Sequence, residues 1–261
     1  MSRLRTQVKH LLIRWGTIPL FHRLEIETCS TCNRYCPTCL RNSHPDRERA
    51  APWFKMALLP EAVIKRILEE ALGLGFHGSV CLQHYNEPLM DERIGELGRM
   101  TRDMRGFSEV IINTNADYIT PERAAALDGI FDRIIVALYM DEPKKSEREQ
   151  WVRGLFTRTR LEFTGGVHIA THYSPDFPVA ELAARHRENP CDLPLERMII
   201  NHRGEMLLCC DDLVGNFNLG NVSQSSLREL WYSPQHQRIV KDLLQAGGRR
   251  KHSYCETCPR A

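Results

Sequence analysis

The chain has 261 residues, of which 42% are hydrophobic and 26% are charged, and its net charge is +2. This length suffices for one large domain, or for one domain with a small appendage. A charge so close to zero gives no reason to expect a nucleic acid as partner. The chain has no apolar run of roughly 18 residues, so no membrane span is expected. The basic N-terminus lacks the continuous apolar segment of a secretion signal, which favours the cytoplasm.

The hydrophobic pattern alternates between strands and helices up to about residue 175. Residues 1–22 are expected to form an amphipathic helix on the outside of the domain, and residues 41–57 a polar loop. Strands are expected at residues 23–28, 79–84, 109–113, 133–138, 160–163 and 167–171. Helices are expected at residues 59–72, 91–104, from 120 onward, and at 144–156. This alternation indicates about five βαβ units and a parallel sheet.

The pattern changes after a segment that contains Pro175, Pro178 and Pro190. A β-hairpin is expected at residues 198–208 and a helix at about 225–245, followed by a terminal C-x2-C. We therefore predict an N-terminal helical extension at residues 1–22, an α/β part at 23–178 and a small C-terminal domain at 179–261.

The ten cysteines fall in two groups, at residues 29–39 and 191–258, with Cys81 alone between them. Disulfides persist in oxidising compartments, and no export signal is present. Short spacings within each group are typical of metal ligands. The sequence therefore predicts two metal sites.

The first group contains Cys32, Cys36 and Cys39 at the spacing C-x3-C-x2-C, directly after the first expected strand. Cysteine thiolates are the normal ligands of iron–sulfur clusters. The motif resembles that of the radical S-adenosylmethionine (SAM) superfamily, in which three cysteines hold a [4Fe–4S] cluster and SAM binds the remaining iron. The resemblance implies a partial (β/α) barrel of five or six units, and a 5′-deoxyadenosyl radical that abstracts a hydrogen atom. From the residues alone, a zinc site completed by Cys29 or a histidine is the alternative.

Two further segments resemble SAM-binding stretches of this superfamily. His84-Tyr-Asn-Glu-Pro88 resembles its Gly-Glu-Pro stretch, and Asn113-Thr-Asn-Ala-Asp117 its Thr-Asn-Gly-Asp. Ligands of α/β sheets bind at such C-terminal strand ends. Thr38 stands where the superfamily usually has an aromatic residue. The resemblance implies these SAM-binding candidates: Thr38, Tyr85, Asn86, Glu87 (for the SAM amino group), Asn113, Asn115, Tyr139 and Asp141. A solvated loop is the alternative for each.

The second group contains Cys191, Cys209, Cys255 and Cys258. Their order, with a hairpin before Cys209, resembles the SPASM extension of radical SAM enzymes in its shorter "twitch" form. That form binds one auxiliary [4Fe–4S] cluster through four thiolates. A zinc ribbon uses the same number of cysteines and is the alternative.

Beyond residue 22 the chain is similar to short aminocyclitol dehydrogenases of this superfamily. The similarity implies that a secondary alcohol of a sugar or aminocyclitol is oxidised to a ketone, with the auxiliary cluster accepting an electron. It also implies a flavodoxin- or ferredoxin-type electron donor. Thr171-His-Tyr-Ser174 stands where Asn-Arg-Gly-Gly would be expected, so His172 and Tyr173 are candidate substrate contacts. A buried, hydrogen-bonded histidine is the alternative.

Cys210 adjoins a ligand of the second group. Related epimerases use a cysteine thiol to donate a hydrogen atom to the substrate radical, so Cys210 is a candidate donor, with an inert thiol as the alternative. Cys81, in a strand, is expected to be an inert core thiol. Two other functions stay open: modification of a peptide or protein side chain, and a zinc-binding module without enzymatic activity.

Overall fold

The computed structural model describes residues 16–50, 56–165 and 170–260, which form an α/β fold on one seven-stranded sheet. The strand order is β5-β4-β3-β2-β1-β6-β7. The strands are β1 (Arg23–Ile26), β2 (Ser79–Cys81), β3 (Glu109–Thr114), β4 (Arg133–Ala137), β5 (Arg160–Thr164), β6 (Arg197–Ile200) and β7 (Met206–Leu207). All neighbours pair in parallel except β6 and β7, so the predicted parallel sheet is confirmed. Most of the strand expected at residues 167–171, and residues 1–15 of the expected N-terminal helix, lie outside the described residues.

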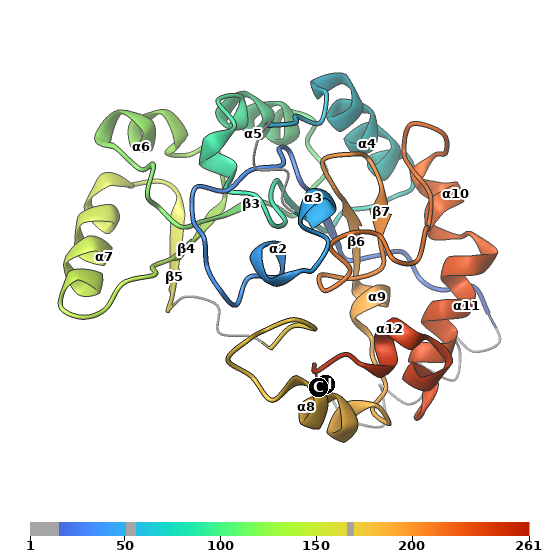
Figure 1. Ribbon diagram of the computed structural model, residues 1–261. Coiled ribbons are helices and arrows are strands. Elements are labelled where there is room, and N and C mark those ends of the chain that lie inside the picture. The colour runs from blue at the N-terminus through green and yellow to red at the C-terminus, as the bar shows by residue number, and fades with distance from the viewer. Residues whose placement is uncertain (1–15, 51–55, 166–169, 261) are drawn as a thin grey trace, which may run out of the picture.

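Helices connect the consecutive parallel strands, as the alternating pattern predicts. They are α4 (Glu61–Gly73), α5 (Ile94–Asp103), α6 (Pro121–Leu127) and α7 (Lys144–Leu155), with the short 3-10 helix η1 (Pro88–Met90) before α5. The start of α6 follows the expected cap, since the Thr120 side chain accepts a hydrogen bond from the Arg123 backbone N–H and proline occupies the first turn. Figure 1 shows α6 and α7 beside β4 and β5, at the end of the sheet opposite α10 and α11.

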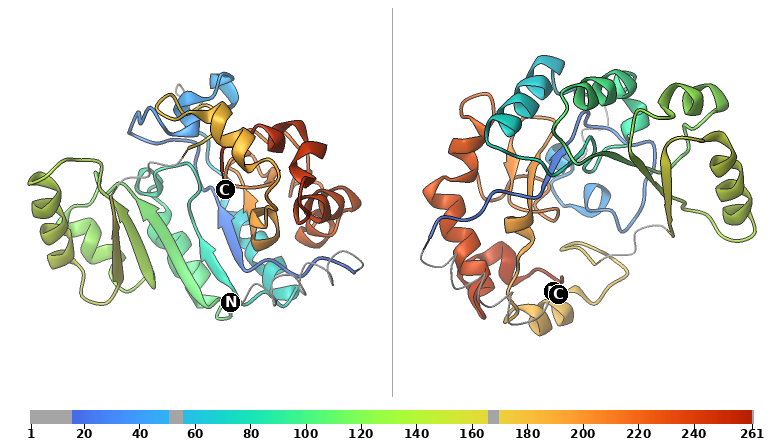
Figure 2. Two further views of the ribbon diagram at one scale, coloured as in Figure 1. Left: turned by 90° about the horizontal axis from the view of Figure 1, so that it is seen from below. Right: turned by 180° about the vertical axis from the view of Figure 1, so that it is seen from behind.

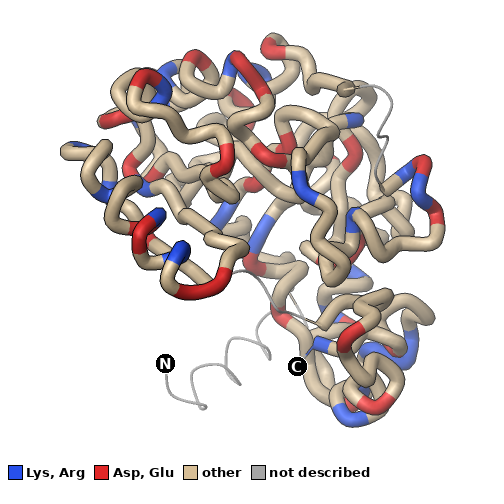
Figure 3. The backbone as a smooth tube through the Cα atoms, turned by 60° about the vertical axis from the view of Figure 1, so that its left-hand side comes forward, with Lys and Arg blue, Asp and Glu red and all other residues tan. Residues whose placement is uncertain are grey.

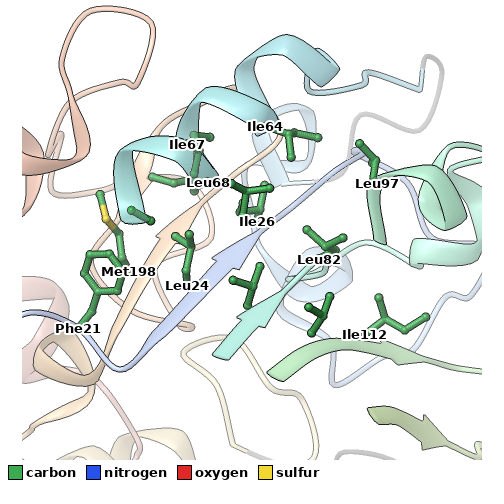
Figure 4. Packing of buried hydrophobic residues seen from close by; sticks show 14 of the residues in the cluster. Phe21, Leu24, Ile26, Ile64, Ile67, Leu68, Leu82, Leu97, Ile112 and Met198 are labelled. Atoms are coloured by element: carbon green, nitrogen blue, oxygen red, sulfur yellow. The ribbon is translucent and has the colours of Figure 1, made fainter. Parts of the chain in front are cut away.

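The apolar core lies between the sheet and these helices. Leu24 and Ile26 of β1 pack with Ile64, Ile67 and Leu68 of α4, and all five are at most 1% exposed. Figure 4 shows these side chains on the same side of the strands, together with neighbours from β2, β3 and β6. This core fixes which face of each strand is covered by helices.

Polar side chains occupy the other face of β1. Successive side chains of a strand point to opposite faces, so Arg23 and Glu25 lie opposite Leu24 and Ile26. Glu25 is nevertheless only 5% exposed. The second face of the sheet is therefore also covered, and it is lined in part by charged groups.

The C-terminal part extends the same sheet and then forms short helices. Its strand β6 pairs in parallel with β1, with Met198 beside Leu24, so the sheet continues across the predicted boundary at residues 178/179. The helices are α8 (Val179–His186), α9 (Leu193–Glu196), α10 (Leu227–Trp231), α11 (Pro234–Leu243), η2 (Gly248–Lys251) and α12 (Ser253–Glu256). Both views of Figure 2 show α10 to α12 packed together beyond β6 and β7.

Two expectations about helices are wrong. The single helix expected at residues 225–245 is two helices, α10 and α11, because Ser233 caps a new helix and Pro234 occupies its first turn. The loop expected at residues 41–57 contains α2 (Leu40–Ser43) and α3 (Arg47–Ala50). Both are single turns, too short for a periodic pattern to reveal.

Basic and acidic residues alternate along the surface of the tube in Figure 3, and neither sign dominates this view. Among the described residues, none of the helices has the length and apolar character needed to cross a membrane.

Candidate active site

Cys32, Cys36 and Cys39 lie in the loop between β1 and α2, and all three thiols are partly exposed. The loop is held by two hydrogen bonds to the Cys36 carbonyl, at 3.0 Å each, from the Cys39 N–H and the Asn42 side-chain amide. Cys39 is the residue before the first turn of α2. The short helix missed in the sequence thus closes the cysteine loop.

Repulsion among the thiolates of Cys32, Cys36 and Cys39 indicates that they bind a positively charged group. Burial, together with the charges of the nearby Cys36 and Cys32, raises the pKa of Cys39 to about 11. Burial also raises the pKa values of Cys32 and Cys36. Three neighbouring thiolates are stable only beside a positive charge, so the donor set fits an iron–sulfur cluster.

Cys29 precedes the three cysteines in the same loop, and its side chain is fully buried. Its Sγ lies 3.5 Å from the Asn86 amide nitrogen and 3.9 Å from the Glu87 carbonyl oxygen. Burial raises its pKa. The zinc site that requires Cys29 as fourth ligand is therefore disfavoured.

The loop after β3 contacts the cysteine loop. The Asn115 amide donates to Asn33 Oδ1 at 2.8 Å and lies 3.9 Å from Cys32 Sγ. Asp117 accepts hydrogen bonds from the Asn33 amide at 2.7 Å and from Arg34 Nε at 2.6 Å. Ala116, which stands where the superfamily has glycine, has a φ of 63°. The backbone thus keeps the left-handed conformation that glycine favours.

Glu87 has a different environment from the one the resemblance implies. Its Oε1 accepts from Thr114 Oγ1 at 2.6 Å and from the Leu89 N–H at 3.0 Å, and its Oε2 accepts from the Asn115 N–H at 2.8 Å. The residue is 2% exposed, and burial raises its pKa. Glu87 therefore joins the ends of β2 and β3 and positions Asn115.

The other SAM-binding candidates divide into inward-facing and exposed residues. Asn86 is buried and its amide donates to Thr28 Oγ1 at 3.4 Å, while the Asn113 amide donates to Gln83 Oε1 at 2.8 Å. Thr38 is half-buried, and Tyr139 and Asp141 are exposed. The Tyr139 carbonyl accepts from Arg34, whose guanidinium lies 5.3 Å from the Tyr139 ring centre. Tyr139 thus lies beside the cysteine loop.

The four cysteines of the second group come from separate elements of the C-terminal part. Cys191 precedes α9, Cys209 follows β7, Cys255 lies in α12 and Cys258 follows that helix. Burial, together with the charges of Asp211 and Cys191, raises the pKa of Cys258 to about 12. Cys191 and Cys258 likewise raise the pKa of Cys255, and Cys258 that of Cys209. The four thiols are thus electrostatic neighbours, and four thiolates fit either a cluster or zinc.

His172 links the segment after β5 to the C-terminal part. Its Nδ1 lies 2.7 Å from Asp211 Oδ2 and its Nε2 lies 2.7 Å from the Tyr254 carbonyl oxygen. The ring also stacks on Tyr254, with 3.9 Å between ring centres. Two acceptors occupy both nitrogens, which favours a structural role for His172. Tyr173 is 37% exposed and packs edge-on against His44.

Tyr85 joins the loop after β2 to the second cysteine group. Its hydroxyl donates to the Cys210 carbonyl at 2.7 Å. Burial raises the pKa of the Cys210 thiol, and the charges of Arg260, Arg197 and Glu25 also act on it. Cys210 therefore lies near the polar face of the sheet.

Sequence reasoning missed the buried acid–histidine pairs of this face. Glu25 Oε2 lies 3.2 Å from His84 Nδ1, and Glu27 Oε2 lies 2.6 Å from His202 Nδ1. The hydrogen bonds and charge of His202 outweigh the effect of burial and lower the pKa of Glu27 to about 2. The alternation of Arg23, Glu25 and Glu27 with apolar residues was visible, but it is also the pattern of a strand with a solvated face.

Comparisons with known proteins agree with this geometry. Residues 191–259 match the model of the SPASM iron–sulfur cluster-binding domain. The chain is 24% identical over 250 residues to an S-adenosyl-L-methionine-dependent 2-deoxy-scyllo-inosamine dehydrogenase of Niallia circulans, which covers 92% of this chain and 93% of that protein. A crystal structure of BtrN in complex with AdoMet and 2-DOIA matches with a TM-score of 0.75 at 21% identity, over 94% of this chain and 95% of that one. SuiB of Streptococcus suis bound to the precursor peptide SuiA matches with a TM-score of 0.64 at 15% identity, over 97% and 78% of the two chains.

The chain thus has the α/β fold of radical SAM enzymes, with an iron–sulfur cluster-binding domain of the SPASM type at residues 191–259. The resemblance drawn from the two cysteine groups is confirmed at this level, as is the fold class.

Proposed function

We propose that this protein is a radical SAM enzyme that oxidises a secondary alcohol of a sugar or aminocyclitol to a ketone. Cys32, Cys36 and Cys39 would hold the [4Fe–4S] cluster that binds SAM, and Cys191, Cys209, Cys255 and Cys258 an auxiliary [4Fe–4S] cluster. The first cluster would supply the electron that cleaves bound SAM to methionine and the 5′-deoxyadenosyl radical, and the second would accept an electron from the substrate radical. A flavodoxin- or ferredoxin-type protein would supply the reducing electron.

The observation that carries this proposal is the pairing of two unlike thiol sets in one fold. The first set has three neighbouring thiols, and Cys29, which precedes them in the chain, is fully buried beside the Asn86 amide. The second set has four. A relative that matches along nearly the whole length of both chains is a dehydrogenase of an aminocyclitol, which supports the substrate class.

The test is the iron and zinc content after anaerobic reconstitution. The wild type is expected to hold roughly eight irons, and a variant with Cys32, Cys36 and Cys39 all replaced by alanine roughly four, from four irons per cubane. The matched control replaces the buried Cys29 and Cys81 by alanine and should keep all the iron. A zinc ion that persists in the triple variant without iron would contradict the auxiliary cluster.

Epimerisation of such a carbon is the second candidate, favoured by the position of Cys210. Its thiol lies within electrostatic range of Glu25 and Arg197, on the polar face of the sheet. Reaction in deuterium oxide separates the two: an epimerase returns product with deuterium at the inverted carbon, while a dehydrogenase gives a carbonyl. Cys210→Ala should abolish the incorporation of deuterium by an epimerase and should leave the formation of a carbonyl by a dehydrogenase unchanged.

A further inference from the structure

Glu25 is the centre of a cluster of buried polar side chains on the polar face of the sheet, here also called its inner face, which lies opposite Leu24 and Ile26. Its Oε1 lies 2.9 Å from Arg23 Nε and 3.0 Å from Arg197 Nη1, and its Oε2 lies 3.2 Å from His84 Nδ1. Burial alone would raise the pKa of Glu25, but His84, Arg197 and Arg23 together lower it. Glu25 is therefore a charged carboxylate whose position is fixed from three strands or strand ends.

The contact between His84 Nδ1 and Glu25 Oε2 fixes the orientation of the His84 ring. The His84 side chain is 3% exposed. The Glu25 carboxylate accepts at Nδ1, so in the neutral ring Nδ1 carries the hydrogen and Nε2 presents a lone pair. His84 Nε2 is buried and has no hydrogen-bond partner among the described residues. Buried polar atoms of this kind are rare in folded proteins and commonly belong to functional sites.

Two neighbouring groups share this property. Arg197 Nε and Asn113 Oδ1 are also buried polar atoms without a hydrogen-bond partner in the described part of the chain. Asn113 is joined to the loop of His84 through Gln83, at 2.8 Å. The set offers one donor and two acceptors, which suits hydroxyl groups, since each hydroxyl both donates and accepts.

His84 lies between the two cysteine groups along its own loop. The next residue, Tyr85, donates to the Cys210 carbonyl at 2.7 Å. Three residues onward, Glu87 accepts from the N–H of Asn115, whose amide lies 3.9 Å from Cys32 Sγ. The loop that carries His84 thus contacts both halves of the site.

We infer that His84 Nε2 accepts the proton of the substrate hydroxyl group, with Glu25 as the positioning residue, in a subsite for the hydroxyl groups of a polyol on this face. The inference rests on the proposed function. The carbon-bound hydrogen atom goes to the 5′-deoxyadenosyl radical, the hydroxyl proton goes to Nε2, and one electron leaves to an oxidant, the auxiliary iron–sulfur cluster. The C–H and O–H bonds break, a C=O π bond forms, and His84 then loses its proton to solvent.

The test uses four variants, which are His84→Gln, His84→Phe, His84→Gly and the control His77→Gln. The two polyols are 2-deoxy-scyllo-inosamine and myo-inositol, deuterated at their carbinol carbons. His84→Gln keeps a polar atom near the position of Nε2 but does not accept a proton; His84→Phe removes both properties. His77→Gln is the matched control, because its ring is exposed at the other end of β2, where Nδ1 lies 2.9 Å from the Gly106 carbonyl oxygen. Binding to the unreduced, SAM-loaded protein is measured by calorimetry, deuterium in 5′-deoxyadenosine by mass spectrometry, and ketone by derivatisation.

In His84→Gln we expect polyol binding and deuterium transfer within about threefold of the wild type, and ketone formation at least about 100-fold lower, as for loss of a general base. In His84→Phe, binding should weaken about 5- to 10-fold as well, as for loss of a hydrogen bond. Added imidazole should restore ketone formation in His84→Gly, which a purely structural role would not allow.

Other outcomes decide against the inference. Ketone formation in His84→Gln as high as in His77→Gln would exclude His84 as proton acceptor. Equal binding by His84→Phe and the wild type, or no polyol binding by the wild type, would overturn the subsite. If the wild type binds a polyol but transfers no deuterium, the proposed function fails, while the binding series still decides the subsite.

Discussion

The contact between His172 and Asp211 gives the sharpest test of how the two halves of the site are joined. Both side chains are buried, at 5% and 1% exposed, with 2.7 Å between Nδ1 and Oδ2. His172→Phe would leave Asp211 with a weak contact from Cys258 Sγ and with Arg260, each at 3.7 Å. Removing one partner of a buried pair costs about 3–5 kcal/mol. At about 2–4 °C per kcal/mol for a chain of this size, the unfolding temperature should fall by about 10 °C.

A double-mutant cycle isolates the pair. His172→Phe, Asp211→Asn and the double variant are unfolded thermally as iron-loaded protein under anaerobic conditions, followed by circular dichroism. We expect a coupling energy of about 1.5–3 kcal/mol, as for a charge-assisted hydrogen bond. The exposed His77→Phe is the control and should change stability by less than about 0.5 kcal/mol. Additivity within about 0.5 kcal/mol would refute the argument, since independent residues add to that degree.

Three further predictions concern local features. Ala116 is buried and has a φ of 63°. Ala116→Gly relieves about 1–2 kcal/mol of backbone strain, but it removes a buried methyl group and raises the entropy of the unfolded chain, so stability should stay within about 0.5 kcal/mol. Ala116→Val should cost more than about 2 kcal/mol, and thermal unfolding measures both variants. Burial lowers the pKa of His236 from 6.5 to about 4. As the pH falls, the unfolded state therefore binds a proton at a higher pH than the folded state does, and stability falls by about 2 kcal/mol between pH 7 and pH 5. His236→Gln should remove this loss of stability from the pH profile of unfolding. The Trp231 indole N–H donates to the Pro19 carbonyl at 3.0 Å, so Trp231→Phe should cost about 1–3 kcal/mol in the same unfolding assay.

The alternation of strands and helices was predictable because each element has its own periodicity and caps. Thr120-Pro121 begins α6 where the sequence places it. The pairing of β6 with β1 was not predictable. A hairpin pattern predicts only that β6 pairs with β7, and it does not say which strand pairs with the other edge of β6. Ser233-Pro234 was a visible start signal inside a continuous apolar period, and the period alone misassigned it.

The two cysteine groups were recognisable in the sequence because their spacing is a local property of the chain. The role of Glu87 was harder to predict, since its three hydrogen bonds come partly from β3 and the residue after it. Glu25 and His84 lie 59 positions apart in the sequence. Only the curvature of the sheet and the covering C-terminal part turn this polar strand face inward, and neither feature has a local signal.

The segment Thr171-His-Tyr-Ser174, where the resemblance leads us to expect Asn-Arg-Gly-Gly, places its histidine against the C-terminal part. His172 has both ring nitrogens occupied by Asp211 and Tyr254, so this segment joins the barrel to the C-terminal part. His84 Nε2, Asn113 Oδ1 and Arg197 Nε, three buried atoms without a hydrogen-bond partner among the described residues, lie instead on or next to β2, β3 and β6. A substrate would then be recognised by the inner face of the sheet, so variants of Arg197 and Asn113 should alter the choice among polyols, while His172 variants should alter stability. If His172→Phe shifts polyol preference at an unchanged unfolding temperature, the segment after β5 contacts the substrate after all.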